Sequence, residues 1–227
     1  MESNVQPNSK PPRKPYVQIM ALLLFLVVMP LGSWYYLSTG LDYQKVARAE
    51  LKDYGKLPAF SLLNQNDFPI TRDSLNGNML LASFFRLDGP ENAERFRMLR
   101  ALHEQFDDRP DVWFVQHTLS PAAAGGAELK AFAKTVDLAE EGQCIYLNGS
   151  PEQTAQLLRE GYHIPEAGMP KDDAGKLKIA ADLPAELKDY PYFVLVDDEG
   201  VIRNYYDYRD PGQMKRLVEH MAILMPR

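Results

Sequence analysis

The feature that most constrains this chain is a run of apolar residues near its start, from Val17 to Leu37. At ~1.5 Å rise per residue, a helix over this run is roughly 31 Å long, enough to cross a hydrocarbon core of about 30 Å. The aromatic residues Trp34–Tyr36 lie near one end, where a membrane interface favours them, and Pro30 is tolerated in a spanning helix. The sequence therefore predicts one transmembrane helix over residues 17–37.

Basic residues in front of this run predict its orientation. Lys10, Arg13 and Lys14 precede it, and the positive-inside rule places residues 1–16 in the cytoplasm. A cleaved signal peptide is the alternative, but the apolar run is longer than a usual signal sequence and bulky aromatics follow it where small residues would mark cleavage. We expect a retained single-pass anchor in a bacterial inner membrane, with the lipid bilayer as its partner and the C-terminal part in the periplasm.

Composition excludes several classes of function. One cysteine in 227 residues cannot form an intramolecular disulfide, a CxxC redox pair, a zinc ribbon or an iron–sulfur cluster. The formal net charge of −6 argues against nucleic-acid binding, which usually needs a basic face. Because the segment before the apolar run is basic, the exported part is more acidic than the whole chain. No serine-histidine-aspartate order, phosphate-binding glycine loop or paired-carboxylate spacing indicates a hydrolase or nucleotide enzyme.

The exported part divides into a stalk and one folded domain. Residues 38–56 are polar and predict a partly helical stalk, and residues 57–227 predict the domain. Within the domain, strand and helix patterns alternate, which predicts an α/β fold with a central sheet covered by helices on both faces. The predicted strands are 79–85, 112–118, 144–147, 192–196 and 201–206, and the predicted helices are 92–106, 127–136, 151–161 and one that starts at Asp210-Pro211.

Local signals fix several of these boundaries. Ser150-Pro151-Glu152-Gln153 has the pattern of a capping box with proline at the first helical position. Asp197–Gly200 has the pattern of a hairpin turn between two strands. Asp88 stands shortly before the helix that enters at Asn92, and we expect it to cap that helix.

This order of elements, with Pro191 directly before an apolar strand, resembles the thioredoxin fold, and four stretches narrow the resemblance to the SCO1/SenC group. The stretches are Leu57–Leu62 with Leu75–Asn78, Leu80–Phe85, Phe114–Pro121, and Cys144–Ser150 with Gln153. The group consists of membrane-tethered thioredoxin-like proteins that deliver copper to cytochrome oxidase or act as thiol reductants for it. The resemblance implies a thioredoxin-like domain over about residues 57–224, and a cis peptide bond before Pro191.

The chain differs from the group at the positions of the group's metal-binding and redox residues. The group has C-x-x-x-C directly after the strand, and the matching positions here are Asp88 and Asn92. The group's histidine position falls at Asp189 or Tyr190. Copper(I) prefers thiolate, thioether or imidazole ligands, and disulfide exchange requires thiols. We therefore expect no copper delivery through this loop, no redox catalysis and no cofactor.

Other residues with reactive side chains have ordinary structural explanations. Cys144 lies on a predicted central strand, where a buried and inert thiol is expected. His117 ends a strand on the side of the former active loop, and His163 begins a longer loop. A new metal site from His117, His163 and Asp88 is an alternative, although no H-x-H or H-x-x-x-H spacing supports it.

Together these features predict a non-catalytic accessory or assembly subunit of a respiratory complex, either cytochrome c oxidase or a supercomplex that contains it. Its partners are then respiratory membrane-protein subunits, which dock on the loop of Asp88, Gly89 and Pro90 and on the facing Tyr190 and Pro191. The alternative is a copper or redox chaperone for cytochrome oxidase that uses non-standard ligands such as His117 and His163. A binding module unrelated to respiration is a third possibility.

Overall fold

A computed structural model describes residues 15–119, 125–138, 143–164 and 190–225 of the chain. The chain divides into two units, Met1–Val46 and Ala47–Arg227. We call the second unit the sheet domain and describe each unit by itself.

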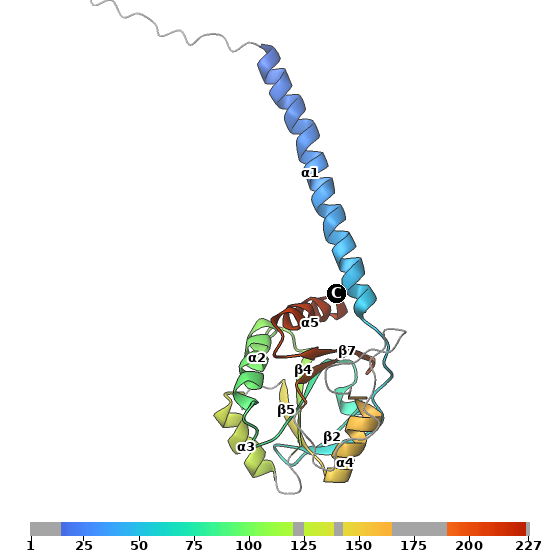
Figure 1. The fold of residues 1–227 in the computed structure, drawn as a ribbon, viewed down its shortest axis with the longest axis vertical. Helices are drawn as coiled ribbons and strands as arrows, with labels where there is room; N and C mark the ends of the chain where they lie inside the picture. The colour runs from blue at the N-terminus through green and yellow to red at the C-terminus, as the bar shows by residue number, and fades with distance from the viewer. Residues whose placement is uncertain (1–14, 120–124, 139–142, 165–189, 226–227) are drawn as a thin grey trace, which may run out of the picture. The chain divides into compact units, whose positions relative to one another are not determined.

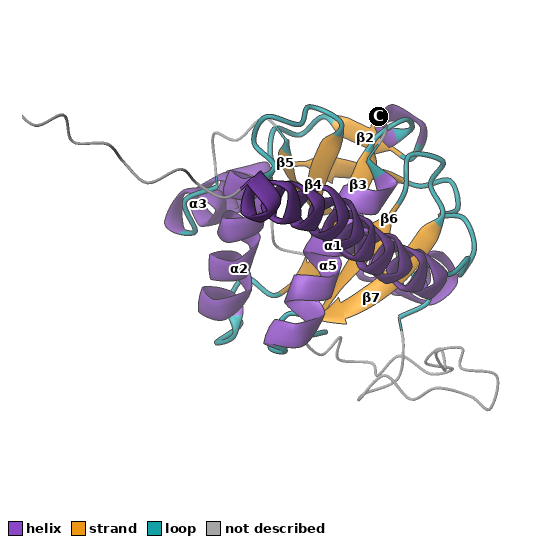
Figure 2. Ribbon diagram, turned by 90° about the horizontal axis from the view of Figure 1, so that it is seen from above, coloured by secondary structure: helices purple, strands orange, loops and turns teal. Residues whose placement is uncertain are grey.

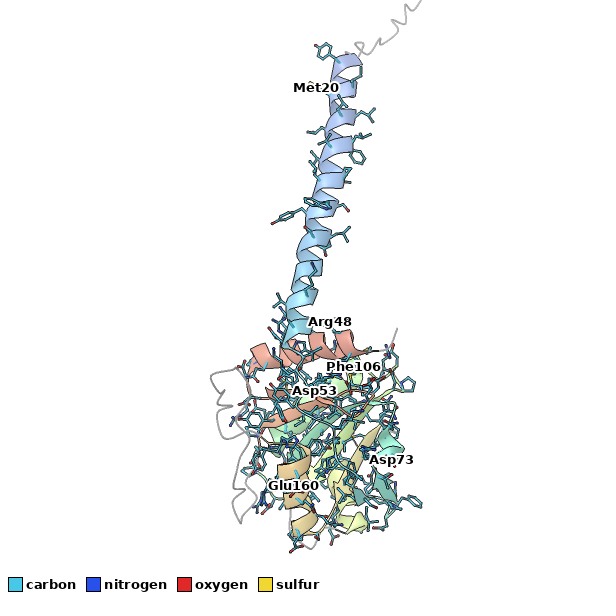
Figure 3. All side chains as sticks on the ribbon, turned by 90° about the vertical axis from the view of Figure 1, so that its right-hand side faces the viewer. Met20, Arg48, Asp53, Asp73, Phe106 and Glu160 are labelled. Atoms are coloured by element: carbon cyan, nitrogen blue, oxygen red, sulfur yellow. The ribbon has the colours of Figure 1, made fainter. Side chains whose placement is uncertain are left out.

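The first unit is dominated by helix α1, Pro15–Glu50, which begins two residues before the predicted span and continues into the sheet domain. Within it, Ile19–Ser38 is long and apolar enough to cross a membrane. Its apolar side chains point outward on all sides, as at Met20 in Figure 3. Pro30 lies inside α1 without ending it, as expected for a spanning helix.

The sheet domain is built on a seven-stranded mixed sheet with the order β2-β1-β5-β4-β3-β6-β7. Strands β3, β4 and β5 run parallel at its centre, and β1 and β6 join them antiparallel on either side. The hairpin partners β2 and β7 form the two edges. The strands are β1 (Ser61–Asn64), β2 (Pro69–Thr71), β3 (Met79–Phe85), β4 (Val112–Thr118), β5 (Cys144–Asn148), β6 (Tyr192–Val196) and β7 (Ile202–Asp207).

Helices cover both faces of the sheet, as predicted. Figure 1 shows α2 (Asn92–Gln105) and α3 (Gly126–Thr135) on one side of the sheet and α4 (Pro151–Gln156) on the other. Helix α5 (Pro211–Leu224) lies beside α2 (Figure 2). A π-helical turn, η2 (Leu157–Gly161), continues α4, and a short 3₁₀ turn, η1 (Asp73–Leu75), follows β2.

Two apolar cores form, one on each face, because the central strands are buried on both sides. All seven residues of β3 are buried, which explains its continuous apolar sequence. Leu81 and Phe85 pack into the core under α2, α3 and α5. Leu80 and Phe84 pack into the opposite core, against η2 and the chain around Leu57. The alternation within one strand is the period of two that strands impose on their side chains.

Several boundary signals are confirmed. Ser150 Oγ accepts a hydrogen bond from the Gln153 amide and the Gln153 side chain accepts one from the Ser150 amide, so the capping box is complete. Asp210 caps α5 by accepting from the amides of Gly212 and Gln213. In the β6–β7 turn, Gly200 has φ of 78°, a conformation that favours glycine.

The sheet domain includes chain that lies before the predicted start at Leu57. Ala47, in the last turn of α1, is fully buried. Lys52 and Tyr54 donate backbone hydrogen bonds to Arg203 and Ile202 of β7, each 3.0 Å long. This part of the predicted stalk therefore packs as part of the domain.

Candidate functional site

The loop between β3 and α2 is the position where the resemblance places the functional residues, and backbone hydrogen bonds give it a compact shape. The Gly89 amide donates to the Arg86 carbonyl at 3.1 Å, and the Asn92 amide donates to the Gly89 carbonyl at 3.2 Å. The Asn92 side-chain amide donates to the same Arg86 carbonyl at 2.6 Å. Asn92, at the position of the second thiol, thus holds the loop closed.

Asp88, at the position of the first thiol, does not cap α2. The residue before the helix is Glu91, whose backbone is already helical and whose side chain makes no cap hydrogen bond. Asp88 instead pairs with Arg86 at 3.2 Å, and its side chain is 74% exposed. The hydrogen bond from Arg86 lowers the pKa of Asp88. The expectation of a cap was wrong because the cap position is Glu91, three residues beyond Asp88, and the Asp88 carboxylate is paired with Arg86.

Arg95 links this loop to the opposite strand. Its side chain is fully buried in the first turn of α2, and its Nη1 donates to Asn92 Oδ1 at 3.1 Å. Its Nη2 lies 3.4 Å from the Tyr208 hydroxyl, and the guanidinium carbon lies 5.0 Å from the centre of the Tyr208 ring. The same Nη2 donates to the Tyr190 carbonyl at 3.5 Å. One side chain therefore connects the loop of Asp88–Asn92 to the segment before β6.

The Tyr190–Pro191 bond is trans, because no peptide bond among the described residues is cis. The expectation of a cis bond was therefore wrong, and this chain has the isomer that is intrinsically favoured for bonds before proline. The Tyr190 carbonyl accepts from Arg95, and the Pro191 carbonyl accepts from the Tyr208 amide at 3.1 Å. Burial raises the pKa of the Tyr190 hydroxyl.

The donor set of this loop does not fit copper(I). Asp88 is a hard carboxylate engaged by Arg86, and the Asn92 amide is engaged by Arg95 and a backbone carbonyl. Tyr190 replaces the soft imidazole at one of the two candidate positions, and Asp189, the other, lies outside the described residues. Neither carboxylate nor amide is a good ligand for a soft cation.

The two histidines offered as an alternative site, His117 and His163, each have another hydrogen-bond partner. His117 is 2% exposed and stacks on Phe84, with ring centres 5.4 Å apart. Its Nε2 is hydrogen-bonded to the Tyr162 hydroxyl at 2.8 Å, and burial lowers the pKa of His117 to about 3. His163 Nδ1 lies 3.2 Å from the Arg159 carbonyl instead. Among the described residues, no group of three or more His, Cys, Asp or Glu side chains is arranged to hold a metal.

Cys144 is buried in β5, as expected, with an exposed fraction of 2%. The side chain of Gln65 continues the sheet beside it, donating to the Cys144 carbonyl at 3.4 Å and accepting from the Tyr146 amide at 3.0 Å.

Arg95 is the site residue that the sequence reasoning missed. The signal was present, because positions 95, 99, 102 and 106 share one helical face and three of them are apolar. An arginine in such a stripe lies against the core with at least its apolar stem, and a guanidinium that is buried there needs hydrogen-bond acceptors around it.

Comparisons with known proteins agree with this fold. No protein-family model and no curated protein matches the sequence. A SCO1/SenC family lipoprotein from Bacillus anthracis matches in structure with a TM-score of 0.56 and 19% identity, over 76% of this chain and 97% of its own. BsSco, a member of the Sco family of cytochrome c oxidase assembly proteins, matches with a TM-score of 0.57 and 16% identity, over 78% of this chain and 97% of BsSco. ScoI of Bradyrhizobium japonicum with copper bound matches with a TM-score of 0.51 and 18% identity, over 75% of this chain and 100% of the ScoI chain.

These likenesses cover nearly the whole of each solved structure, while the identities stay below one residue in five. They concern the arrangement of the sheet and helices, and the placement of Asp88 and Asn92 at the thiol positions stays a prediction from the sequence resemblance. The sheet domain has the thioredoxin-like fold of the SCO1/SenC proteins.

Proposed function

We propose that this chain is a membrane-tethered, non-catalytic accessory or assembly subunit of a respiratory complex, cytochrome c oxidase or a supercomplex that contains it. In this proposal α1 anchors it in the inner membrane, with the basic N-terminus in the cytoplasm and the sheet domain in the periplasm. The similarity to Sco proteins, one of which is described as an oxidase assembly protein, supports the respiratory assignment. The apolar span Ile19–Ser38 supports the anchor.

One observation carries the non-catalytic part of the proposal. The loop after β3 presents a carboxylate and an amide in place of two thiols, and arginines engage both of them. The loop is thereby shaped as a fixed surface without redox-active atoms. We propose that a partner docks on Asp88–Pro90 and on Tyr190 and Pro191, which Arg95 holds close to the first turn of α2.

Affinity purification tests the partner. The tagged full chain would be extracted from its host membranes in a mild detergent, and the co-purifying proteins quantified by mass spectrometry. We expect cytochrome oxidase subunits to be enriched, and to fall at least fivefold with Asp88→Lys. The matched control is Asp73→Lys, another exposed aspartate next to an arginine, on η1. If no oxidase or cytochrome subunit is enriched, the respiratory assignment fails.

A copper(I) competition titration tests whether the loop after β3 lacks copper-binding ability. The full chain in detergent should not compete with a chelator of micromolar affinity, because its loop lacks soft ligands. The variant Asp88→Cys/Asn92→Cys should compete, since it restores two thiols at those positions. Stoichiometric binding by the unmodified chain, lost on His117→Ala or His163→Ala, would instead favour the chaperone alternative.

A further inference from the structure

At the two outer edges of the sheet, the chain itself occupies some of the backbone groups that could pair with another strand. Along β7, Lys52 and Tyr54 donate backbone hydrogen bonds that occupy part of the edge. Along β2, Pro69 has no N–H to offer, and the Thr71 amide is taken by Ser74 Oγ at 3.1 Å. Closing exposed edges in this way prevents unwanted pairing with other chains.

Strand β1 lies between β2 and β5, and the first part of its β5 side has no partner strand. Strand β1 pairs with β5 only at Leu63 and Asn64. The capping box draws the chain away directly after β5, because the Ser150 amide donates to Gln153 Oε1 at 2.9 Å. Within the described ranges, no strand therefore pairs with Ser61 or Leu62 on the β5 side.

The ladder of β1 and β2 shows which backbone groups point to this open edge. The Asn64 amide donates to the Phe68 carbonyl at 2.9 Å, and the Arg72 amide donates to the Phe60 carbonyl at 3.4 Å. In an antiparallel ladder, alternate residues turn their N–H and C=O groups to opposite sides. Phe60, Leu62 and Asn64 thus face β2, and Ser61 directs its backbone groups toward the open side.

This open edge lies in a groove of about 280 Å³ between residues 58–62 on one side and α4 with η2 on the other. Phe60 and Leu157 supply apolar surface, while Gln156 and Glu160 are exposed on the helical wall and are joined by a hydrogen bond of 2.9 Å. Figure 3 shows Glu160 on the outer surface of this helical segment. The wall includes the π-helical turn, a distortion that often marks functional sites.

We propose that this groove binds an extended peptide segment of a partner protein, which adds a short strand to the open edge of β1 and places a basic side chain beside Glu160. Backbone N–H and C=O groups on a strand edge are matched by another strand, which favours an extended peptide over other ligands. The Glu160 carboxylate selects a lysine or arginine, and Phe60 with Leu157 accommodates an apolar side chain. This site is separate from the loop of Asp88–Pro90, and its existence does not depend on the respiratory assignment.

A defined peptide tests the proposal on the full chain in detergent micelles. The probe is a fluorescent seven-residue peptide of alternating threonine and valine with lysine at each end. We expect saturable binding in the micromolar range, weakened several-fold when glutamates replace the lysines. Two further peptides carry N-methyl groups on alternate backbone nitrogens, each on one of the two edges of the extended peptide. The peptide methylated on the edge that faces β1 should bind at least tenfold more weakly, and the other should bind unchanged, because only one edge can pair with β1.

Variants of the chain locate the site. Gln156→Tyr fills the groove from an exposed helix position and should weaken binding at least tenfold, whereas the matched Arg159→Tyr, which does not line the groove, should not. Ser61→Pro removes the N–H of the open edge and should act like Gln156→Tyr. Hydrogen exchange at the Ser61 amide should slow when the peptide is added.

Three outcomes would overturn the proposal. They are the absence of saturable binding up to millimolar peptide, equal binding by both methylated peptides, and equal binding by the Gln156→Tyr and Arg159→Tyr variants. Equal binding by the methylated peptides would indicate an apolar ligand site without strand addition. None of these outcomes bears on whether oxidase subunits co-purify with the chain.

Discussion

Arg95 is the residue whose environment differs most from that of an ordinary surface arginine. Its buried guanidinium bonds to Asn92, Tyr190 and Tyr208. Replacing it by methionine keeps much of the volume but leaves buried acceptors without a donor, which typically costs 1–3 kcal/mol for each group. We expect Arg95→Met to lower the free energy of unfolding by about 2–4 kcal/mol, measured by urea denaturation of the full chain in detergent.

The control for Arg95 is Arg97, on the same helix. Its side chain is 63% exposed and lies 3.9 Å from Glu94, an arrangement in which an ion pair contributes little. Arg97→Met should change the unfolding free energy by less than about 0.5 kcal/mol. Equal effects of the two substitutions would show that the buried network does not stabilise the loop.

His117 makes stability depend on pH. Its folded-state pKa of about 3 lies below the ordinary value of 6.5, because burial disfavours the charged ring. Between these values the unfolded chain binds a proton that the folded chain does not, so stability is complete above about pH 6.5 and falls as the pH drops toward 3. The slope approaches about 1.4 kcal/mol per pH unit.

We expect His117→Gln to flatten this dependence between pH 6.5 and 4.5, while keeping a polar partner for the Tyr162 hydroxyl. Urea denaturation at several pH values measures it, and His163→Gln is the control because that ring is only partly buried. Burial also lowers the pKa of His220, so some dependence should remain in the variant. A slope unchanged by His117→Gln contradicts the prediction.

At the scale of elements, local chemistry was enough to predict most boundaries. The Ser150 capping box, the start of the last helix near Asp210-Pro211 and the β6–β7 turn depend on neighbours within a few residues, and the structure confirms each of them. Two predictions were wrong. The cap at Asp88 was a local prediction, and it failed because α2 starts at Asn92 with Glu91 at the cap position, while Asp88 pairs with Arg86. The cis bond before Pro191 came from the resemblance, and that segment is held by contacts with Arg95 and Tyr208. The sequence pattern does not reveal which of several acceptors a buried arginine reaches.

The capping box of α4 can be measured as a coupled pair. Ser150→Ala and Gln153→Ala each remove one of the reciprocal hydrogen bonds, and each should cost about 1 kcal/mol of unfolding free energy. The double variant should cost less than the two single effects combined, because either loss already loosens the same turn. Strict additivity in a double-mutant cycle would show that the two bonds act independently.

For the whole sheet domain, the segment before Leu57 completes the fold. Glu50 pairs with Arg216 of α5 through two bonds of 2.8 and 2.9 Å, joining residues 166 positions apart. Tyr54 packs edge-on against Tyr205, with ring centres 5.2 Å apart. Beside them, Tyr206 hydrogen-bonds to the buried His220, whose Nε2 lies 3.6 Å from Glu50. The polar composition of residues 47–56 predicted a stalk because these partners are distant in the sequence.

A fragment that starts at Ala47 should therefore be more stable than one that starts at Leu57. The shorter fragment loses the Glu50–Arg216 pair and leaves the edge of β7 open, which also favours aggregation. We expect its melting temperature to be lower by roughly 10 °C or more, since a loss of 1 kcal/mol shifts a domain of this size by about 2–4 °C. Thermal denaturation followed by circular dichroism measures the difference. The longer fragment with Lys52→Pro loses only the hydrogen bond to Arg203, and its melting temperature should lie between those of the two fragments. Equal melting temperatures for all three would show that residues 47–56 are only a tether.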